Sequence, residues 1–241
     1  MNKYTFIASV SVALFFAACG DDSSSVEPSL DESSSSVVLS SSSSFSVILS
    51  SSSVSSPMSS WSGGGAGAIG SITDSRDGQS YKTVSIGTQT WMAQNLNYET
   101  ANSYCYSDSP SNCTKYGRLY TWAAAKTACP TGWNLPAYEE FKTLFTAVGG
   151  STGTKLKSTS GWNSGGNSVS GTDNYSFSAL PAGYWNDDGK YDREGYDAYF
   201  WSSSEYDRTY AYRMYLSYDY GSAGLVSSYK YDGFSVRCVK D

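Results

Sequence analysis

Residues 81–94 decide the fold, and they read Tyr81-Lys82-Thr83-Val84-Ser85-Ile86-Gly87-Thr88-Gln89-Thr90-Trp91-Met92-Ala93-Gln94. In the first six, polar residues separate the apolar Tyr81, Val84 and Ile86, a near-alternation that is typical of a strand that buries one face. Gly87 supplies a turn, and residues 89–93 have the composition of a second strand. We therefore predict that residues 81–93 form an antiparallel β-hairpin.

Two short helices are predicted after this hairpin, over residues 122–128 and 137–148. Thr121 is placed to cap the first helix, which ends before Pro130. The second helix follows Pro136 and ends at a pair of glycines. Its apolar side chains recur at the spacing of a helix that faces a core, and they are Phe141, Leu144, Phe145 and Val148.

The rest of the domain is expected to consist of loops and strands. Residues 99–117 are polar and loop-like, and residues 151–175 are Ser/Gly/Thr/Asn-rich loops around Trp162. Strand-like runs then follow at residues 177–180, 199–201, 210–218, 226–231 and 234–239. Helices early and hairpins late predict an α+β fold, with two short helices and a hairpin-rich antiparallel sheet.

The start of the chain has the features of an exported lipoprotein. Lys3 precedes an apolar run over residues 6–18, and Cys19 follows small residues. A positive start, a short apolar run and small residues before the cut are typical of a secretory signal. The cysteine resembles the lipobox of a bacterial lipoprotein, so we expect residues 1–18 to be a signal peptide and Cys19 to be lipidated. Phe16 occupies the third position before Cys19, where leucine is commoner in lipoprotein signals. A plain secretory signal is therefore the alternative.

A serine-rich tether is predicted between the signal and the domain, over residues 19–72. Serine fills 22 of the 38 positions from residue 23 to residue 60. Such a stretch buries too little apolar surface to offset the entropy of ordering. We therefore expect attachment to the outer membrane through the lipid, with the domain exposed on the cell surface.

The remaining residues, 73–241, have the usual size of a single domain. The chain holds 22 acidic and 16 basic residues, of which five acids and one lysine precede this domain, so its net charge is −2. There is no basic stripe to neutralise phosphates, and nucleic acid is not an expected partner. Aromatic residues are abundant, with 21 tyrosines and 7 tryptophans in the chain. Tyrosine suits strands that meet water and surfaces that meet sugars or proteins.

The cysteines of the domain point to disulfide bonds. Four cysteines allow three pairings. In an oxidising compartment we favour Cys105–Cys113, which closes a short polar loop, and Cys129–Cys238, which joins the middle of the domain to its last strand. A metal site is the rival interpretation, but the spacings are not those of zinc ribbons.

The chain contains no histidine, which excludes Ser-His-Asp and Cys-His catalysis. No glycine-rich loop with a phosphate-binding lysine is present. We expect no metal and no cofactor. A glycosidase needs only two carboxylates, and the candidate acids are Asp187, Asp188, Asp192, Glu194, Glu205 and Asp207.

Binding features are more numerous than catalytic ones. Flat aromatic rings stack on the C–H faces of sugars, while carboxylates and arginine bond to hydroxyl groups. Trp185-Asn186-Asp187 superficially resembles a lectin calcium motif, but we expect only a hairpin turn at residues 186–189 and no calcium. The candidate ligand-binding residues are Trp185, Tyr191, Trp201, Glu205, Tyr206, Tyr210 and Arg213.

Six motifs together resemble the Fibrobacter major paralogous domain. They cover nearly all of residues 74–241 and lie at 87–98, 116–122, 128–136, 180–183, 200–205 and 233–239. Asn134 replaces a histidine that is common in the family. The resemblance implies a C-type-lectin-like fold, related to formylglycine-generating enzymes and stapled by a long-range disulfide. It also implies a lipoprotein on the surface of fibre-degrading bacteria, and it implies no established activity.

These observations lead us to expect a surface-anchored, non-catalytic binding or adhesion protein that recognises polysaccharide. One alternative is a structural or protein-interaction component of the cell envelope. Another is a histidine-free glycosidase that uses paired carboxylates.

Overall fold

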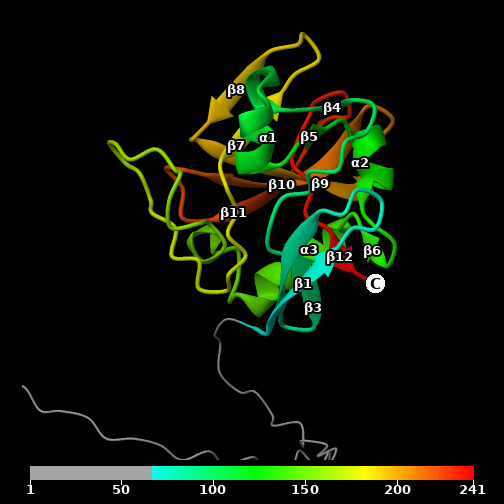
Figure 1. The fold of residues 1–241 in the computed structure, drawn as a ribbon. Helices are drawn as coiled ribbons and strands as arrows, with labels where there is room; N and C mark the ends of the chain where they lie inside the picture. The colour runs from blue at the N-terminus through cyan, green and yellow to red at the C-terminus, as the bar shows by residue number, and fades with distance from the viewer. Residues whose placement is uncertain (1–66) are drawn as a thin grey trace, which may run out of the picture. The chain divides into compact units, whose positions relative to one another are not determined.

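The structure is a computed structural model that describes residues 67–241 (Figure 1). The predicted lipidation site at Cys19, the signal peptide and most of the serine-rich tether lie outside the described residues. Secondary structure begins at β1 (Ile69–Thr73), slightly before the predicted start of the domain at residue 73.

The predicted hairpin is confirmed as β2 (Ser80–Ile86) and β3 (Gln89–Met92), in which Val84 lies opposite Trp91. Both side chains are fully buried. Tyr81 and Thr83, on the other face of β2, are buried as well, so the prediction that this strand buries one face is wrong. β1 pairs with the outer edge of β2. Beyond β3 the same antiparallel sheet continues with β12 (Val239–Lys240) and then β6 (Trp133–Asn134). The chain end is thus inserted between two earlier strands.

Both predicted helices are confirmed, as α2 (Trp122–Ala128) and α3 (Tyr138–Ala147). Thr121 is the N-cap residue of α2, but its side chain makes no capping hydrogen bond. At the start of α3, the Ala137 N–H donates to the Glu140 carboxylate at 2.7 Å. At its end, the Gly150 N–H donates to the Phe145 carbonyl, and Gly150 has a positive φ of 102°.

The prediction of a loop at residues 99–117 is wrong. This segment contains β4 (Ser103–Tyr104), a 3-10 helix (Tyr106–Asp108) and α1 (Pro110–Tyr116). Pro110 at the first helical position favours α1, because the backbone N–H group that proline lacks would have no hydrogen-bond partner within the helix at that position. Cys113 and Tyr116 are three residues apart and both buried, so even this polar helix has an inner face.

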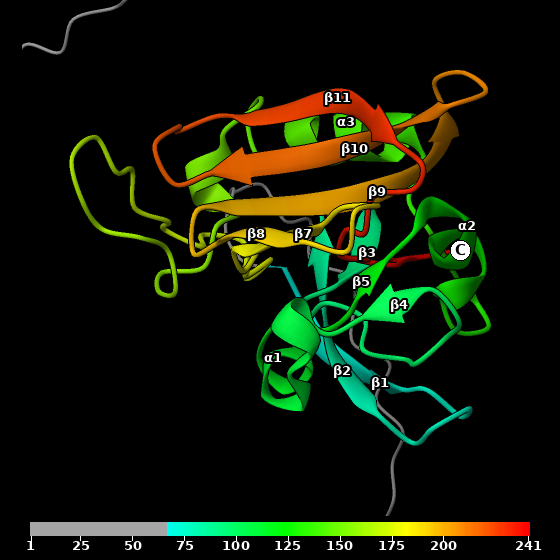
Figure 2. The same ribbon diagram turned by 90° about the horizontal axis from the view of Figure 1, so that it is seen from above.

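The second large sheet contains the aromatic strands of the last third of the chain. Its order is β11-β10-β9-β7-β8. Figure 2 shows β11, β10 and β9 side by side. β7 pairs with β9 in parallel, and the other neighbours are antiparallel. The strand bounds are Ala182–Trp185 for β7, Tyr191–Glu194 for β8, Asp197–Glu205 for β9, Tyr210–Ser217 for β10 and Ala223–Tyr229 for β11.

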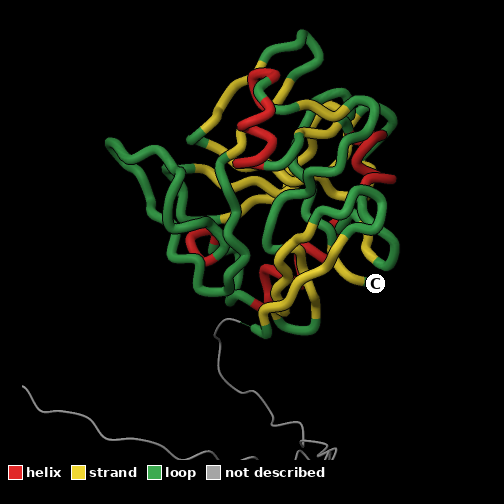
Figure 3. The backbone as a smooth tube through the Cα atoms, in the orientation of Figure 1, coloured by secondary structure: helices red, strands yellow, loops and turns green. Residues whose placement is uncertain are grey.

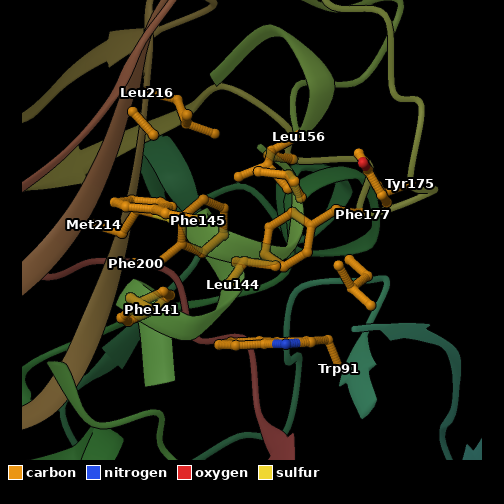
Figure 4. Packing of buried hydrophobic residues seen from close by; sticks show 14 of the residues in the cluster. Trp91, Phe141, Leu144, Phe145, Leu156, Tyr175, Phe177, Phe200, Met214 and Leu216 are labelled. Carbon is orange, nitrogen blue, oxygen red and sulfur yellow. The ribbon is translucent and has the colours of Figure 1, made fainter. Parts of the chain in front are cut away.

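Side chains pack against both faces of this sheet. Figure 4 shows Phe141 and Phe145 of α3 close to Phe200 and Met214, with Trp91 of the first sheet beneath them. On the other face, Trp201 packs with Phe234 at 4.5 Å between ring centroids. Both faces of β10 therefore contribute to the core, Met214 to one cluster and Ala211 to the other.

Two of the predicted strands are not regular strands. Residues 177–180 and 234–239 contain isolated bridges, such as Phe200 to Ser235, and only β12 at the chain end. Ser176 and Ser178 have positive φ angles of 54° and 51°, which interrupt an extended chain. The carbonyls of Phe177 and Ser178 instead accept hydrogen bonds from the buried Arg237. Loops make up much of this region, as the tube trace in Figure 3 shows.

Both predicted disulfides are confirmed. Cys105 and Cys113 are bonded with a Cα–Cα distance of 4.9 Å, and Cys129 and Cys238 with one of 5.9 Å. The second bond spans 109 residues and joins the end of α2 to the approach of β12. The fold is therefore a disulfide-stapled α+β domain with mainly antiparallel sheets. It has three α-helices within residues 67–241, not the predicted two.

Candidate ligand-binding cavity

One surface cavity of about 530 Å³ is walled by aromatic and charged side chains. Its volume falls within the range of roughly 300–1,000 Å³ that is usual for sites of small ligands. We call it the Trp185 cavity. Its lining comes from β4, α2, the β7–β8 turn, the β9–β10 turn and the segment after β11, and consists of Asn102, Tyr104, Thr121, Trp122, Ala123, Lys126, Trp185, Asp187, Arg208, Thr209, Lys230 and Tyr231.

Two stacked rings form one aromatic part of this cavity. The rings of Tyr104 and Trp185 lie 4.0 Å apart between centroids and 19° from parallel. The backbone of Trp185 is held on both sides, because its N–H donates to the Gly233 carbonyl and its carbonyl accepts from the Gly233 N–H. Gly233 permits this approach, since a Cβ there would lie 3.1 Å from the Cβ of Trp185. The fold therefore fixes the base of the Trp185 side chain.

A third ring comes from Trp122, the first residue of α2. Its indole N–H donates to the Ser202 carbonyl at 2.8 Å, which fixes the plane of the ring. Tyr231 completes the aromatic lining, and it is 63% exposed. The cavity thus combines fixed rings with one ring that is open to solvent.

Lysine side chains approach the Trp122 ring from two elements. The Nζ atoms of Lys126 and Lys230 lie 4.0 and 4.6 Å from its centroid. Lys230 is held further by the Glu205 carboxylate and by the carbonyls of Asp207 and Arg208. This network keeps the Lys230 ammonium group in place at the cavity.

The β7–β8 turn brings Asp187 to the cavity wall. The turn is closed by hydrogen bonds between Asn186 and Lys190, including one from the Lys190 N–H to the Asn186 side chain at 2.8 Å. This confirms the predicted hairpin turn at residues 186–189. Burial raises the pKa of the neighbouring Asp232 to about 6, the negative charge of Asp187 adds to the rise, and Arg213 opposes it.

The candidate residues do not all meet at one surface. Trp185 lines the cavity, and Glu205 contacts its lining residue Lys230. Tyr191 is the cross-strand partner of Trp185, but its hydroxyl donates to Asp108 and its ring packs against Tyr106. It therefore lies beside the cavity and does not line it.

The prediction that Trp201 and Arg213 bind a ligand is wrong, because neither residue lines the cavity. Trp201 has no exposed surface, and its indole N–H donates to the Tyr120 carbonyl, so it is a core residue. The Arg213 guanidinium lies over the rings of Tyr199 and Phe234, at 4.3 and 5.2 Å. Burial lowers its pKa. Arg213 contributes to packing within the second sheet and does not line the cavity.

Tyr206 and Tyr210 belong to a separate group of tyrosines at the β9–β10 turn. Tyr206 meets the edge of Tyr212 at 5.4 Å, and Tyr210 packs against Tyr229 at 4.5 Å. Neither lines the Trp185 cavity. The seven candidate ligand-binding residues thus do not form one surface: some lie at or beside the cavity, others in the core, and two in a tyrosine cluster.

Most of the cavity lining was not among the sequence-based candidates. Tyr104, Trp122, Lys126, Arg208, Lys230 and Tyr231 come from segments far apart in the chain, and no local motif links them. The only signal in the sequence is the general abundance of aromatic residues. Asp187 is a sequence-based candidate as a catalytic acid and as part of the hairpin turn, and not as a ligand-binding residue.

A second cavity, of about 620 Å³, lies next to the Cys105–Cys113 disulfide. It is polar, and Arg118 on its wall pairs with Glu99 at 3.2 Å and donates to the Ser103 side chain at 2.9 Å. Tyr104 lines both cavities. Residues 67–241 contain no group of three His, Cys, Asp or Glu side chains arranged to hold a metal ion.

These features define a class of small, disulfide-stapled α+β domains with an aromatic surface cavity. The chain belongs to the Fibrobacter succinogenes major domain family, whose sequence profile matches residues 84–240. No curated protein and no solved structure matches the chain. No helix within the described residues is long and apolar enough to cross a membrane.

Proposed function

We propose that this protein is a surface-anchored, non-catalytic binding or adhesion lipoprotein that recognises polysaccharide through the Trp185 cavity. The observation that carries the proposal is the joint presence of flat rings and charged groups on one open wall. Tyr231 is 63% exposed and offers a face for sugar C–H groups, the stacked pair of Tyr104 and Trp185 adds ring surface to the lining, and Asp187 and Arg208 can bond to hydroxyl groups.

The anchoring part of the proposal depends on residues outside the described domain. Cys19 follows a signal-like segment and precedes a serine-rich stretch. Lipidation there would fasten the protein to the outer membrane, and the tether would let the domain reach ligands beyond the envelope. A C-type-lectin-like ancestry of the fold is part of the same proposal, supported by the long-range disulfide Cys129–Cys238.

Three of the six candidate acids that a glycosidase would need are engaged in contacts within the domain, whereas Asp187 lines the cavity. Glu205 pairs with Lys230, and Glu194 lies 3.6 Å from Lys115. The Asp207 carboxylate accepts the backbone N–H groups of residues 209 and 210, which caps its own turn. These contacts favour binding over hydrolysis. Release of reducing sugar that disappears in Glu205→Gln would favour the glycosidase instead.

A pull-down of the full-length chain on insoluble cellulose and hemicelluloses tests the proposal. We expect retention that soluble oligosaccharide releases, and loss of that retention in Tyr231→Ala and Trp185→Ala. Tyr220→Ala is the matched control, because Tyr220 is 58% exposed and lies outside the cavity lining. Unchanged retention in both cavity variants would reject this site. Capture of envelope proteins alone would support the alternative of a protein-interaction component.

A further inference from the structure

The lining of the Trp185 cavity carries an excess of positive charge. Lys126, Arg208 and Lys230 line it, against the single acid Asp187. The domain as a whole has a net charge of −2, so the sign of the charge at the cavity lining is opposite to that of the whole domain. When Glu205 is counted as the partner of Lys230, the lining keeps two cations, Lys126 and Arg208, against Asp187, whose charge also interacts with the neighbouring Asp232.

Lys126 is the first cation available to a ligand. Its Nζ lies 4.0 Å from the Trp122 ring centroid, and the Lys230 Nζ lies 4.6 Å from the same centroid. Within residues 67–241, Lys230 pairs with Glu205, whereas Lys126 makes no ion pair. Two ammonium groups near one ring repel each other, and a bound anion would relieve this repulsion. The Trp122 ring thus holds an uncompensated positive charge at the cavity wall.

Arg208 is the second available cation. It sits in the β9–β10 turn, where the Thr209 and Tyr210 N–H groups donate to the Asp207 carboxylate at 2.7 and 2.8 Å. The Arg208 carbonyl also accepts from Lys230 at 3.1 Å, so its backbone is held at the rim. No hydrogen bond or ion pair engages its guanidinium within the described residues. A free guanidinium can bind a carboxylate through two parallel hydrogen bonds.

We infer that the Trp185 cavity selects an acidic polysaccharide, one whose sugar rings carry carboxylates, over its neutral counterpart. This inference rests on the proposed function, and it adds the ligand class. The sugar ring would stack on the exposed aromatic faces, and its carboxylate would meet Arg208 and Lys126. Asp187 would accept a hydrogen bond from a hydroxyl group and repel a carboxylate bound in the wrong register.

Affinity electrophoresis of the full-length chain tests the inference directly. The probes are polygalacturonate, alginate and glucuronoxylan, each beside a form whose carboxylates are esterified, so that ring and linkage stay the same and only the charge is lost. We expect at least one acidic polymer to bind about tenfold or more tightly than its ester, since hydrogen bonds to charged groups have this worth. Added salt should weaken the binding.

Charge-removing variants locate the effect. Arg208→Gln and Lys126→Gln should each weaken binding of the acidic polymer about tenfold, with little change for the ester. Lys82→Gln is the matched control, because it removes an exposed lysine from β2 in the other sheet. Equal binding of acid and ester, or unchanged binding in both cavity variants, would overturn the inference while leaving polysaccharide binding intact. Binding to no polysaccharide at all would reject the proposed function itself.

Discussion

The guanidinium of Arg237 donates a hydrogen bond to the carbonyl of Phe177 and lies 4.8 Å from the centroid of the Phe177 ring. Arg237 is fully buried, and its other acceptors are the Ser178 carbonyl, the Met92 carbonyl and the Asn95 side chain. Burial lowers its pKa to about 9. Arg237, which lies just before β12, thus connects the end of the chain to the loop at residues 177–178. The acceptors of its guanidinium are uncharged oxygen atoms.

Replacing Arg237 should destabilise the domain strongly. Arg237→Ala leaves three buried acceptors and one partly buried acceptor without their donor, and each buried loss costs about 1–3 kcal/mol. We expect a total loss of at least about 3 kcal/mol in the free energy of unfolding, measured by urea denaturation. Arg208→Ala is the control, since its side chain makes no such contacts. A loss below about 1 kcal/mol for Arg237→Ala would contradict the structural role.

The two disulfides should contribute unequally to stability. In the chain-entropy model, a bond that closes a loop of 109 residues contributes about 4.8 kcal/mol, and one that closes 8 residues about 2.5 kcal/mol. The double serine variant of Cys129 and Cys238 should therefore lose more stability than that of Cys105 and Cys113. Denaturation of both variants under oxidising conditions measures the difference. The reverse order would show that the model does not apply here.

Alanine substitutions at two glycines with positive φ distinguish the cost of backbone strain from the cost of steric overlap. Gly183 has φ of 64°, and a Cβ there would lie 2.2 Å from the Asp192 carbonyl oxygen. Gly132 has φ of 81°, but a Cβ there would meet nothing within 4 Å. We expect Gly132→Ala to cost about 1–2 kcal/mol from strain alone, and Gly183→Ala to cost clearly more. Equal losses in thermal or urea unfolding would show that the close approach at Gly183 is unimportant.

Asp232 should make stability depend on pH. Its pKa in the folded state is about 6, against 3.8 for an ordinary aspartate, so the folded state binds more protons between these values. The free energy of unfolding should then fall as pH rises from about 4 to 6, by an amount on the order of 1 kcal/mol because Asp232 is partly screened by water. Asp232→Asn should remove this slope, while Asp188→Asn, in an exposed turn, should keep it. A slope that persists in Asp232→Asn would assign it to another group.

Much of the fold could be predicted because its signals are local. The alternation in residues 81–86, the apolar spacing of α3 and the turn at residues 186–189 each specify a structure within a few residues. The disulfide pairing followed from loop length and the position of Cys238. These elements depend little on the rest of the chain.

The remainder depends on contacts between distant residues. Residues 177–180 look like a strand, but their carbonyls are drawn to Arg237. Lys157 would be expected at the surface, yet it is fully buried and donates to the carbonyls of Val169, Ser217 and Tyr220. The Trp185 cavity likewise joins β4, α2 and the segment after β11. No pattern within a single segment predicts such contacts.

The central claim is that the Trp185 cavity binds sugar. NMR spectroscopy of the tryptophan indole N–H resonances of the full-length chain tests this claim most directly. On titration with an acidic oligosaccharide, we predict saturable shifts for Trp185 and Trp122, which line the cavity. The resonances of the buried Trp91 and Trp201, and of Trp162, which packs against the core cluster of Trp91, should not move. Shifts confined to Trp162, or no shift at any ligand concentration, would contradict the account.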